Sequence, residues 1–339
     1  MIELLAKLVS GADLTHEEMS ALMQLIMTGQ ASPAQIGSAL TALRIKGETV
    51  EEIAAAAEVM RSLSVKVEVD SDQLVDTCGT GGSGIRKFNV STASALVLAA
   101  AGAKVAKHGN RAASGVSGSA DVLEAAGLPL DLNPVQVARS IEQVGVGFLF
   151  AVNHHGAMKH AIGPRRELKF RTIFNLLGPL TNPAGTKRQV LGVFDPKWLR
   201  PMAEVLIKLG TERALVVHSR DGLDELSVAA QSDVVEVRGG ECFEYSIDPA
   251  ALGCGPHNLK DLAIESAQAS LAMIESAFSG QNLAAESMVA LNAGAALFVA
   301  EKAGSIEEGV TIAREVMRSG QATAKLRELV AFGQNLVVQ

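Results

Sequence analysis

A glycine-rich stretch at residues 78–92, CGTGGSGIRKFNVST, contains the residues whose types and spacing most clearly suit chemistry. Four closely spaced glycines are followed by two hydroxyl residues at the start of an expected helix: Gly79, Gly81, Gly82, Gly84, Ser91 and Thr92. Such a turn presents backbone N–H groups and the positive end of a helix dipole to an anion. It has no Gly-Lys-Ser/Thr of a Walker A loop, and no acid follows about 20 positions later as in dinucleotide-binding turns. We expect it to bind phosphate or diphosphate, and a ligand-free chain reversal is the alternative.

A second polar stretch, KHGNRAASGVSGSAD at residues 107–121, follows the next expected strand. Its cations and hydroxyls, separated by glycines, again suit phosphate oxygens, while His108 and Asn110 have the donors and acceptors to bind a planar polar ligand. Open α/β sheets bind ligands at the carboxyl ends of their strands, so both stretches are expected to face one site. Taken alone, this stretch would also suit a solvated loop.

Two adjacent acids, Asp224 and Glu225, lie in the stretch HSRDGLDELS after another expected strand. Paired carboxylates beside a diphosphate are suitable ligands for Mg²⁺, which prefers oxygen and is often shared with phosphates. An ordinary acidic turn is the alternative. His154, His155 and His160 match no standard zinc spacing, so we expect no zinc site.

Three arginines, Arg165, Arg166 and Arg171, lie in the stretch GPRRELKFRTIFNLLGPLTNPAG. An arginine that faces the cleft would pair with a carboxylate through two parallel hydrogen bonds. Some of the three are expected to be surface residues on an amphipathic helix.

The chain must be long enough to bring these stretches together, and its 339 residues suit two domains. The formal net charge is −7, so any anion site is local, and neither nucleic acid nor an anionic membrane is an expected partner. Three cysteines without a disulfide or zinc pattern favour a reduced, cytoplasmic protein. The N-terminus lacks a basic region before an apolar core, so no signal peptide is expected.

The order of the expected elements predicts an α/β fold with two domains. Residues 1–70 contain helix signals, including capping boxes, and no strand-like run, which predicts a small all-helical domain. Strands then alternate with helices, which predicts a larger α/β domain with a mainly parallel central sheet over residues 71–159 and 186–339. Residues 160–185 interrupt the alternation and are expected to pack on the helical domain.

Four stretches, in their order and spacing, are similar to the anthranilate phosphoribosyltransferase family of tryptophan biosynthesis. They are CGTGG…FNVST, KHGNRAASGVSGSADVLEAAG, RRELKFRTIFNLLGPLTNPAG and DGLDELS, and the resemblance covers essentially the whole chain. It implies transfer of the phosphoribosyl group of phosphoribosyl diphosphate (PRPP) to the amine of anthranilate, with release of diphosphate. It also implies two Mg²⁺ ions per monomer and a homodimer formed through the helical domain.

The resemblance also implies roles for individual residues. Catalysis has no acid or base and rests on positioning and electrostatics by Lys107, Asn110 and Arg165. The residues implied for anthranilate are Gly79, His108, Asn110 and Arg165. Those implied for Mg²⁺ are Ser91, Asp224 and Glu225. Those implied for PRPP are Gly79, Gly82, Ser83, Lys87, Asn89, Val90, Ser91, Thr92, Lys107, His108, Gly109, Asn110, Arg111, Ala112, Ala113, Ser114, Gly115 and Ser119.

Two positions depart from the family pattern, which has Asp where this chain has Ser83 and Thr where it has Lys87. The loop is therefore more positive by about two formal charges. We expect Lys87 to take over part of the charge neutralisation of PRPP and to lessen the dependence on a second Mg²⁺. Impaired catalysis is the other consequence that these changes suggest.

Two other functions stay open at this point. One is a nucleic-acid-binding relative without catalysis, which the negative net charge and the retained site residues disfavour. The other is a nucleoside phosphorylase, which shares the fold family, or a transferase for another aromatic amine. The pair Asn110 and Arg165 favours an aromatic carboxylate over these.

Overall fold

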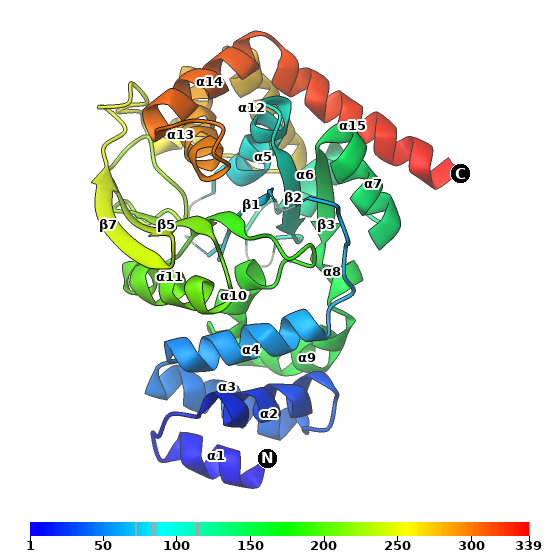
Figure 1. Ribbon diagram of the computed structural model, residues 1–339, viewed down its shortest axis with the longest axis vertical. Coiled ribbons are helices and arrows are strands. Elements are labelled where there is room, and N and C mark those ends of the chain that lie inside the picture. The colour runs from blue at the N-terminus through cyan, green and yellow to red at the C-terminus, as the bar shows by residue number, and fades with distance from the viewer. Residues whose placement is uncertain (72, 83, 85, 113–114, 339) are drawn as a thin grey trace.

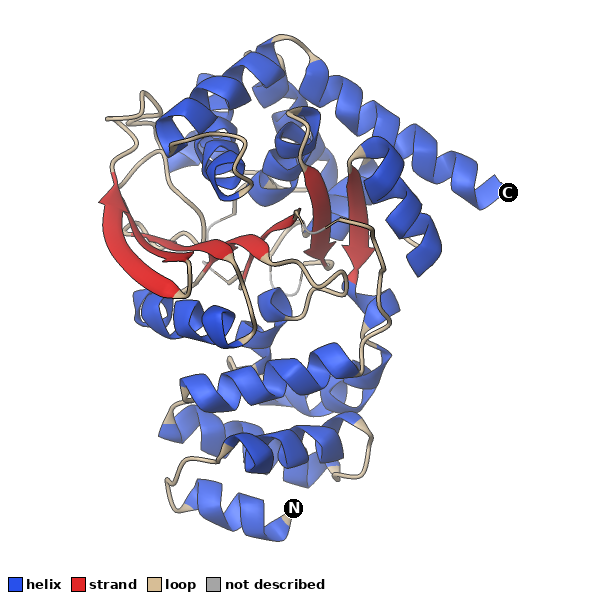
Figure 2. Cartoon of the chain, viewed as in Figure 1, coloured by secondary structure: helices blue, strands red, loops and turns tan. Residues whose placement is uncertain are grey.

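The structure is a computed structural model that describes residues 1–71, 73–82, 84, 86–112 and 115–338. Figure 1 shows a group of N-terminal helices beneath a larger part in which helices surround a sheet, and Figure 2 marks the strands in red. The expected fold class, a small helical domain with an α/β domain around a mainly parallel sheet, is confirmed. Three predicted site residues lie outside the described residues: Ser83, Ala113 and Ser114.

The N-terminal part consists of four helices: α1 (Ile2–Val9), α2 (His16–Met27), α3 (Pro33–Lys46) and α4 (Val50–Ser62). Thr15, Ser32 and Thr49 precede α2, α3 and α4 as capping boxes, in which the cap and the third helical residue satisfy each other's backbone N–H groups. A later helix, α9 (Lys159–Leu168), packs on α2 and α3 and adds Ala161 to their apolar core.

The sheet has seven strands in the order β3-β2-β1-β4-β5-β6-β7. They are β1 (Leu74–Gly79), β2 (Lys104–Gly109), β3 (Val146–Phe150), β4 (Arg188–Gly192), β5 (Arg213–Ser219), β6 (Ser232–Arg238) and β7 (Glu241–Ile247). Strands β1 to β5 pair in parallel, and β6 and β7 extend the sheet as an antiparallel edge. The β6–β7 hairpin turns at Gly239 and Gly240, whose positive φ values of 61° and 80° suit glycine.

Helices cover both faces of the sheet (Figure 2), and successive strand residues enter different cores. Val190 of β4 faces a core made with α5 (Val90–Ala100), α12 (Ala267–Phe278), α13 (Leu283–Val299) and α14 (Ile306–Arg318). Leu191, the next residue, faces α11 (Leu199–Lys208) and α10 (Phe174–Leu177), whose core continues into the N-terminal helices. The other α-helices are α6 (Ser119–Ala125), α7 (Pro134–Val144), α8 (Ala151–His154) and α15 (Gln321–Val338).

No single helix in the described part of the chain is long and apolar enough to cross a membrane. The pair α12 and α13, bent by 83° at the break between them, passes that test by length and composition only. Nearly all of α13 is buried inside the protein, where it packs between α5, α12 and α14.

Candidate active site

The stretches singled out in the sequence converge on the carboxyl edge of the parallel strands. Strand β1 ends at Gly79 and strand β2 at Gly109, and the two strands pair in parallel. Strand β4 ends at Gly192, which is the register partner of Gly79, and β5 leads into the turn that carries Asp224. The glycine-rich loop, the second polar stretch and the paired acids therefore share one edge of the sheet.

Lys87 lies between the two paired acids. Its Nζ atom is 3.4 Å from Asp224 Oδ1 and 3.1 Å from Glu225 Oε2. The side chains of Lys87, Asp224 and Glu225 are only 12%, 8% and 14% exposed, so water screens these charges weakly. Burial opposes the charged form of Lys87, but the two carboxylates outweigh burial and raise the pKa of its ammonium above the ordinary value. Lys87 is therefore a fixed positive charge at this edge.

The glycine-rich loop is held between Asp224 and Arg171. The backbone N–H of Gly81 donates to Asp224 Oδ2 over 2.8 Å. Gly81 and Gly82 have φ values of 69° and 82°, which residues with a side chain rarely adopt. Arg171 donates from Nη2 to the carbonyl oxygen of Gly82, and its guanidinium carbon lies 3.9 Å from the centre of the Phe194 ring. Both contacts fix the loop, and the only backbone N–H group of the loop that they use is that of Gly81.

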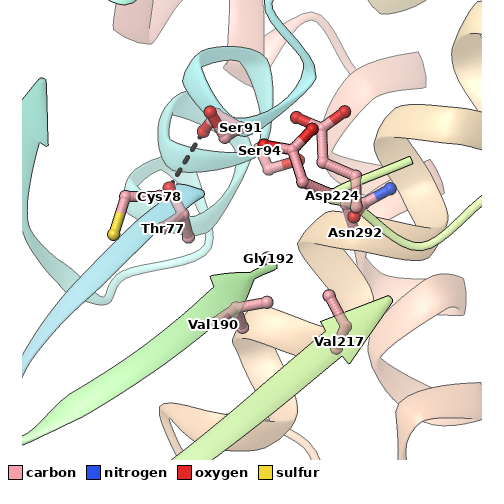
Figure 3. A pocket seen from close by; sticks show the side chains of 10 residues that line it. Thr77, Cys78, Ser91, Ser94, Val190, Gly192, Val217, Asp224 and Asn292 are labelled. Carbon is pink, nitrogen blue, oxygen red and sulfur yellow. Dashed lines mark hydrogen bonds between the residues drawn. The ribbon is translucent and has the colours of Figure 1, made fainter. Parts of the chain in front are cut away.

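A small cavity of about 20 Å³ adjoins the acid pair (Figure 3). It is lined by Thr77, Cys78, Ser91, Ser94, Val190, Gly192, Val217, Asp224, Glu225 and Asn292. Thr77 Oγ1 donates to the Ser91 carbonyl over 2.9 Å, the dashed line in Figure 3, and so ties the first turn of α5 to β1. A cavity of this size holds about one water molecule, so a larger ligand must bind outside it, at the loops.

Lys107 carries a second positive charge to the end of β1. It is 3% exposed, and its Nζ donates to the Thr77 carbonyl over 2.5 Å. Asp76, fully buried on β1, accepts hydrogen bonds from Asn182 Nδ2 at 2.8 Å and from the His108 N–H at 3.2 Å. Burial raises the pKa of the Asp76 carboxyl above its ordinary value, and nearby Lys107 opposes that rise.

His108 and His155 pack against each other near the end of β2, with ring centroids 5.2 Å apart. Their Nε2 atoms are buried and have no hydrogen-bond partner among the described residues. Burial lowers the pKa of His108 well below its ordinary value and lowers the pKa of His155 to about 4. Both rings are therefore neutral at pH 7 and offer a ligand one unused ring nitrogen each.

The second polar stretch folds back on itself. Ser119 Oγ donates to the Asn110 carbonyl over 3.4 Å, and Asn110 Oδ1 accepts from the Arg111 N–H over 2.8 Å. Arg111, predicted to bind PRPP, pairs with Asp121 and Glu124 at 3.0 and 2.7 Å. Acids of the following helix, α6, therefore match the charge of Arg111.

Asn89 connects three segments of the site. It precedes α5, which begins at Val90, one residue earlier than the predicted start. Its Oδ1 accepts from the hydroxyls of Ser117 and Ser270 at 2.8 and 2.7 Å, and Ser270 belongs to α12, 181 residues later. The predicted PRPP ligand Asn89 thus fixes the glycine-rich loop to the second polar stretch and to α12.

The three arginines have different surroundings. Arg165 is partly buried on α9, 5.0 Å from the centre of the Phe174 ring, and burial alone lowers its pKa. Among the described residues, no carboxylate pairs with Arg165. Arg166 is exposed, and Arg171 contacts the glycine-rich loop. Arg165 thus combines partial burial with a charge that no carboxylate of the described residues matches.

Several residues that border the site received no predicted role. Nothing in the sequence distinguishes Arg171 from its two neighbours as the partner of the loop. Ser270 and Asn292 lie in mainly apolar helices far along the chain, and only the fold brings them to the edge of the sheet. Ser94 carries a weak signal, since it follows Ser91 by three positions and therefore shares its helix face.

Comparison with known proteins shows relatives along the whole chain. Residues 71–323 match the family model described as "Glycosyl transferase family, a/b domain", and residues 2–64 match "Glycosyl transferase family, helical bundle domain". Anthranilate phosphoribosyltransferase of Thioalkalivibrio sulfidiphilus is 59% identical over 320 residues, which are 94% of this chain and 95% of that protein. The protein of the same name from Teredinibacter turnerae is 57% identical over 97% of each chain.

Solved structures agree with this relationship. The crystal structure of anthranilate phosphoribosyltransferase from Thermus thermophilus has a TM-score of 0.92 and 44% identity, and the match covers 98% of this chain and 99% of that one. The Saccharomyces cerevisiae enzyme in complex with PRPP and Mg shares the fold, with a TM-score of 0.90, 24% identity and coverage of 98% of both chains.

Proposed function

This chain belongs to the anthranilate phosphoribosyltransferase family of tryptophan biosynthesis, and from that premise we propose that the carboxyl edge of its sheet carries out the reaction. A bond forms between the amine nitrogen of anthranilate and the anomeric carbon of PRPP. The bond from that carbon to diphosphate breaks, and the nitrogen releases one proton to the solvent. The observation that carries the proposal is the convergence of two buried cations, Lys87 and Lys107, with the glycine-rich loop at the start of α5.

Stabilisation of the leaving diphosphate is the main task of the protein, because the transition state is expected to resemble an oxocarbenium ion. Lys107 is almost completely buried, so its charge acts through a poorly screening medium. The N–H groups at the start of α5 add the positive end of the helix dipole. These groups are in place before PRPP binds and need little reorganisation during the reaction.

Recognition of anthranilate falls to Arg165, Asn110 and His108. The unmatched Arg165 guanidinium suits the carboxylate of anthranilate, which accepts two parallel hydrogen bonds. His108 is neutral and has a free ring nitrogen, so it adds a hydrogen-bonding group without a competing charge. The amine is an aniline and largely unprotonated at neutral pH, so a strong general base is not needed.

The acid pair fits Mg²⁺. Asp224 and Glu225 supply the oxygen ligands that Mg²⁺ prefers, Ser91 lines the same cavity, and the pair already attracts a cation in the form of Lys87. Mg²⁺ bound at this edge of the sheet would neutralise charge on the diphosphate. The family resemblance implies two ions per monomer, and the position of Lys87 bears directly on that number.

The proposal extends to the assembly of the protein. Three large apolar side chains of the helical domain, Ile2 and Val9 of α1 and Ile45 of α3, have 78%, 74% and 81% of their surface exposed. Exposed apolar side chains on one small domain suit contact with a second copy, which supports a homodimer formed through the helical domain. The thiols of all three cysteines are free, which agrees with a reducing cytoplasm.

The same proposal divides the chain into two structural units. Residues 1–70 with 160–185 form the helical domain, supported by the packing of α9 on α2 and α3. Residues 71–159 and 186–339 form the domain that binds PRPP. The family matches at residues 2–64 and 71–323 follow the first of these divisions closely.

The test of this function is a direct assay with PRPP, anthranilate and MgCl₂. We expect the fluorescence of anthranilate to decrease only when protein and PRPP are both present, with one diphosphate released for each anthranilate consumed. Aniline, which lacks the carboxylate, is expected to react far more slowly because Arg165 has nothing to bind. No loss of anthranilate under these conditions would refute the proposed function.

A further inference from the structure

The contact of Lys87 with Asp224 and Glu225 bears on how many metal ions the site takes. The ammonium group lies between two adjacent carboxylates, where a shared divalent cation would also have to lie. All three side chains are nearly buried, and a buried charge without a partner is strongly destabilising. Lys87 is therefore the counter-ion of the acid pair.

Contacts other than the ion pair itself position Lys87 and Asp224, each independently of the other. Phe88, the residue after Lys87, is 1% exposed, and its N–H donates to the Leu262 carbonyl over 3.3 Å, which fixes the backbone there. Asp224 uses its second oxygen to accept from the Gly81 N–H over 2.8 Å. The ion pair is thus a property of the fold, unlike pairs between mobile surface side chains, which contribute little.

Formal charges decide whether a metal ion could join Lys87 at the acid pair. Asp224 and Glu225 carry two negative charges, of which Lys87 neutralises one, while a Mg²⁺ ion would neutralise both. Without PRPP, both cations together would leave a positive excess and strong repulsion in a poorly screened place. The negative charges of bound PRPP would reduce this excess, but the ammonium group would still contact the carboxylate oxygens that the ion needs. Ser91 lies beside this pair, because it lines the same cavity as Asp224 and Glu225.

We propose that Lys87 permanently takes the place of the Mg²⁺ ion that Asp224 and Glu225 would share, so that this enzyme binds one Mg²⁺ ion with PRPP instead of two. The inference rests on the proposed function, because it concerns the site that holds PRPP. The replacement of Mg²⁺ by Lys87 makes part of the positive charge at the diphosphate independent of the Mg²⁺ concentration.

The direct test counts metal ions on the wild-type protein. Mn²⁺ accepts the same oxygen ligands as Mg²⁺ and is measured easily. It is dialysed to equilibrium with PRPP on both sides of the membrane and protein on one side. We expect one excess Mn²⁺ ion per protomer at saturation. Two ions per protomer would overturn the proposal, whatever any variant does.

The variant Lys87→Thr tests the role of the lysine itself. It should bind two Mn²⁺ ions per protomer in the same dialysis. The matched control is Lys208→Thr, which removes the same charge from a lysine that pairs with Glu51 at 2.7 Å on the protein surface. The control should keep one ion. One ion in Lys87→Thr as well would show that Lys87 excludes no metal, and the proposal would fail.

Thermal unfolding without PRPP provides a second measurement. Lys87→Thr leaves two nearly buried acids without a counter-ion, so we expect a lower Tm in metal-free buffer and a rise of about 5 °C or more on addition of Mg²⁺. Wild type should shift by less than about 1 °C. Equal Mg²⁺-dependent shifts in the two proteins would contradict the proposal.

Failure of the inference is distinguishable from failure of the proposed function. A protein that neither binds PRPP nor consumes anthranilate refutes the function, and the inference with it. Turnover of anthranilate with two bound ions per protomer refutes only the replacement of Mg²⁺ by Lys87.

Discussion

A Cβ atom at Gly79 would lie 2.6 Å from Oδ2 of Asp224, so the last residue of β1 and the acid after β5 are in direct contact. Gly79→Ala would push the Asp224 carboxylate away from its position beside Lys87 and the Gly81 N–H. The carboxylate is the end of a side chain and is able to move, so the fold should survive with a Tm lowered by less than about 4 °C. Titration calorimetry should show PRPP binding in Mg²⁺ weakened by about tenfold or more.

Two other glycines provide controls for this prediction. Gly37 lies in α3 with open space around its Cβ position, so Gly37→Ala should leave PRPP binding unchanged. At Gly192, a Cβ atom would lie 1.6 Å from the backbone oxygen of Asp224, which has no side-chain torsion to relieve the clash. Gly192→Ala should therefore lower the Tm much more than Gly79→Ala. Unchanged PRPP binding in Gly79→Ala would contradict the inference that Asp224 holds Lys87 and the Gly81 N–H in the positions that PRPP binding needs.

Arg165 is expected to determine the affinity for anthranilate. Removal of a charge-assisted hydrogen bond costs about 1.5–3 kcal/mol, so Arg165→Ala should raise the KM for anthranilate about 10- to 100-fold. The KM for PRPP should change by less than about twofold, because Arg165 does not face the diphosphate in this assignment. The neighbouring exposed Arg166 is the control, and Arg166→Ala should resemble wild type. Equal effects on both KM values would assign Arg165 to the fold instead.

Arg171 is expected to order the glycine-rich loop. It donates to the Gly82 carbonyl and stacks on Phe194, and glutamine at this position would retain neither contact fully. Arg171→Gln should raise the KM for PRPP about 3- to 10-fold, from the loss of about one hydrogen bond. Hydrogen exchange of peptides from the loop should become faster. Arg200→Gln, in a surface pair with Glu204, should change neither quantity.

The pH dependence of stability should reflect His155. Its folded-state pKa of about 4 lies below the ordinary value of 6.5, so the unfolded chain binds a proton between these values while the folded protein does not. His155 therefore does not change the free energy of unfolding above about pH 7, and it lowers that free energy as the pH falls towards 4. His155→Asn should reduce the loss of unfolding free energy between pH 7 and pH 5 by about 2 kcal/mol in urea titrations. His257→Asn, which removes a histidine bonded to Ser287, should show the wild-type loss, and an equal loss in all three proteins would argue against a neutral His155.

The sequence predicts the parts of the site that depend on local chain chemistry. Capping boxes in residues 1–70, such as those of Thr15 and Ser32, act on their immediate neighbours, and the structure has them as expected. Strand alternation predicts the shared carboxyl edge, because parallel strands must end together.

Side-chain partners far apart in the chain could not be predicted in the same way. Lys87 pairs with an acid 137 positions later, and Arg171 reaches the loop across 89 positions. The residue types at these positions are compatible with many partners, and only the packing of the whole chain selects one. For this reason the loop and its charge were predictable, whereas the ion pair of Lys87 with Asp224 and Glu225 was not.

The packing of α9 on α2 and α3 has a consequence for how the protein is made on the ribosome. When residues 1–64 have emerged, the apolar sides of the first helices still lack α9 and α10, which are synthesised about a hundred residues later. The N-terminal bundle is therefore incomplete while β1, β2 and β3 are being translated, and its apolar residues stay exposed until α9 and α10 have been synthesised. The two parts of the molecule mature together, which delays formation of a closed site until most of the chain is present.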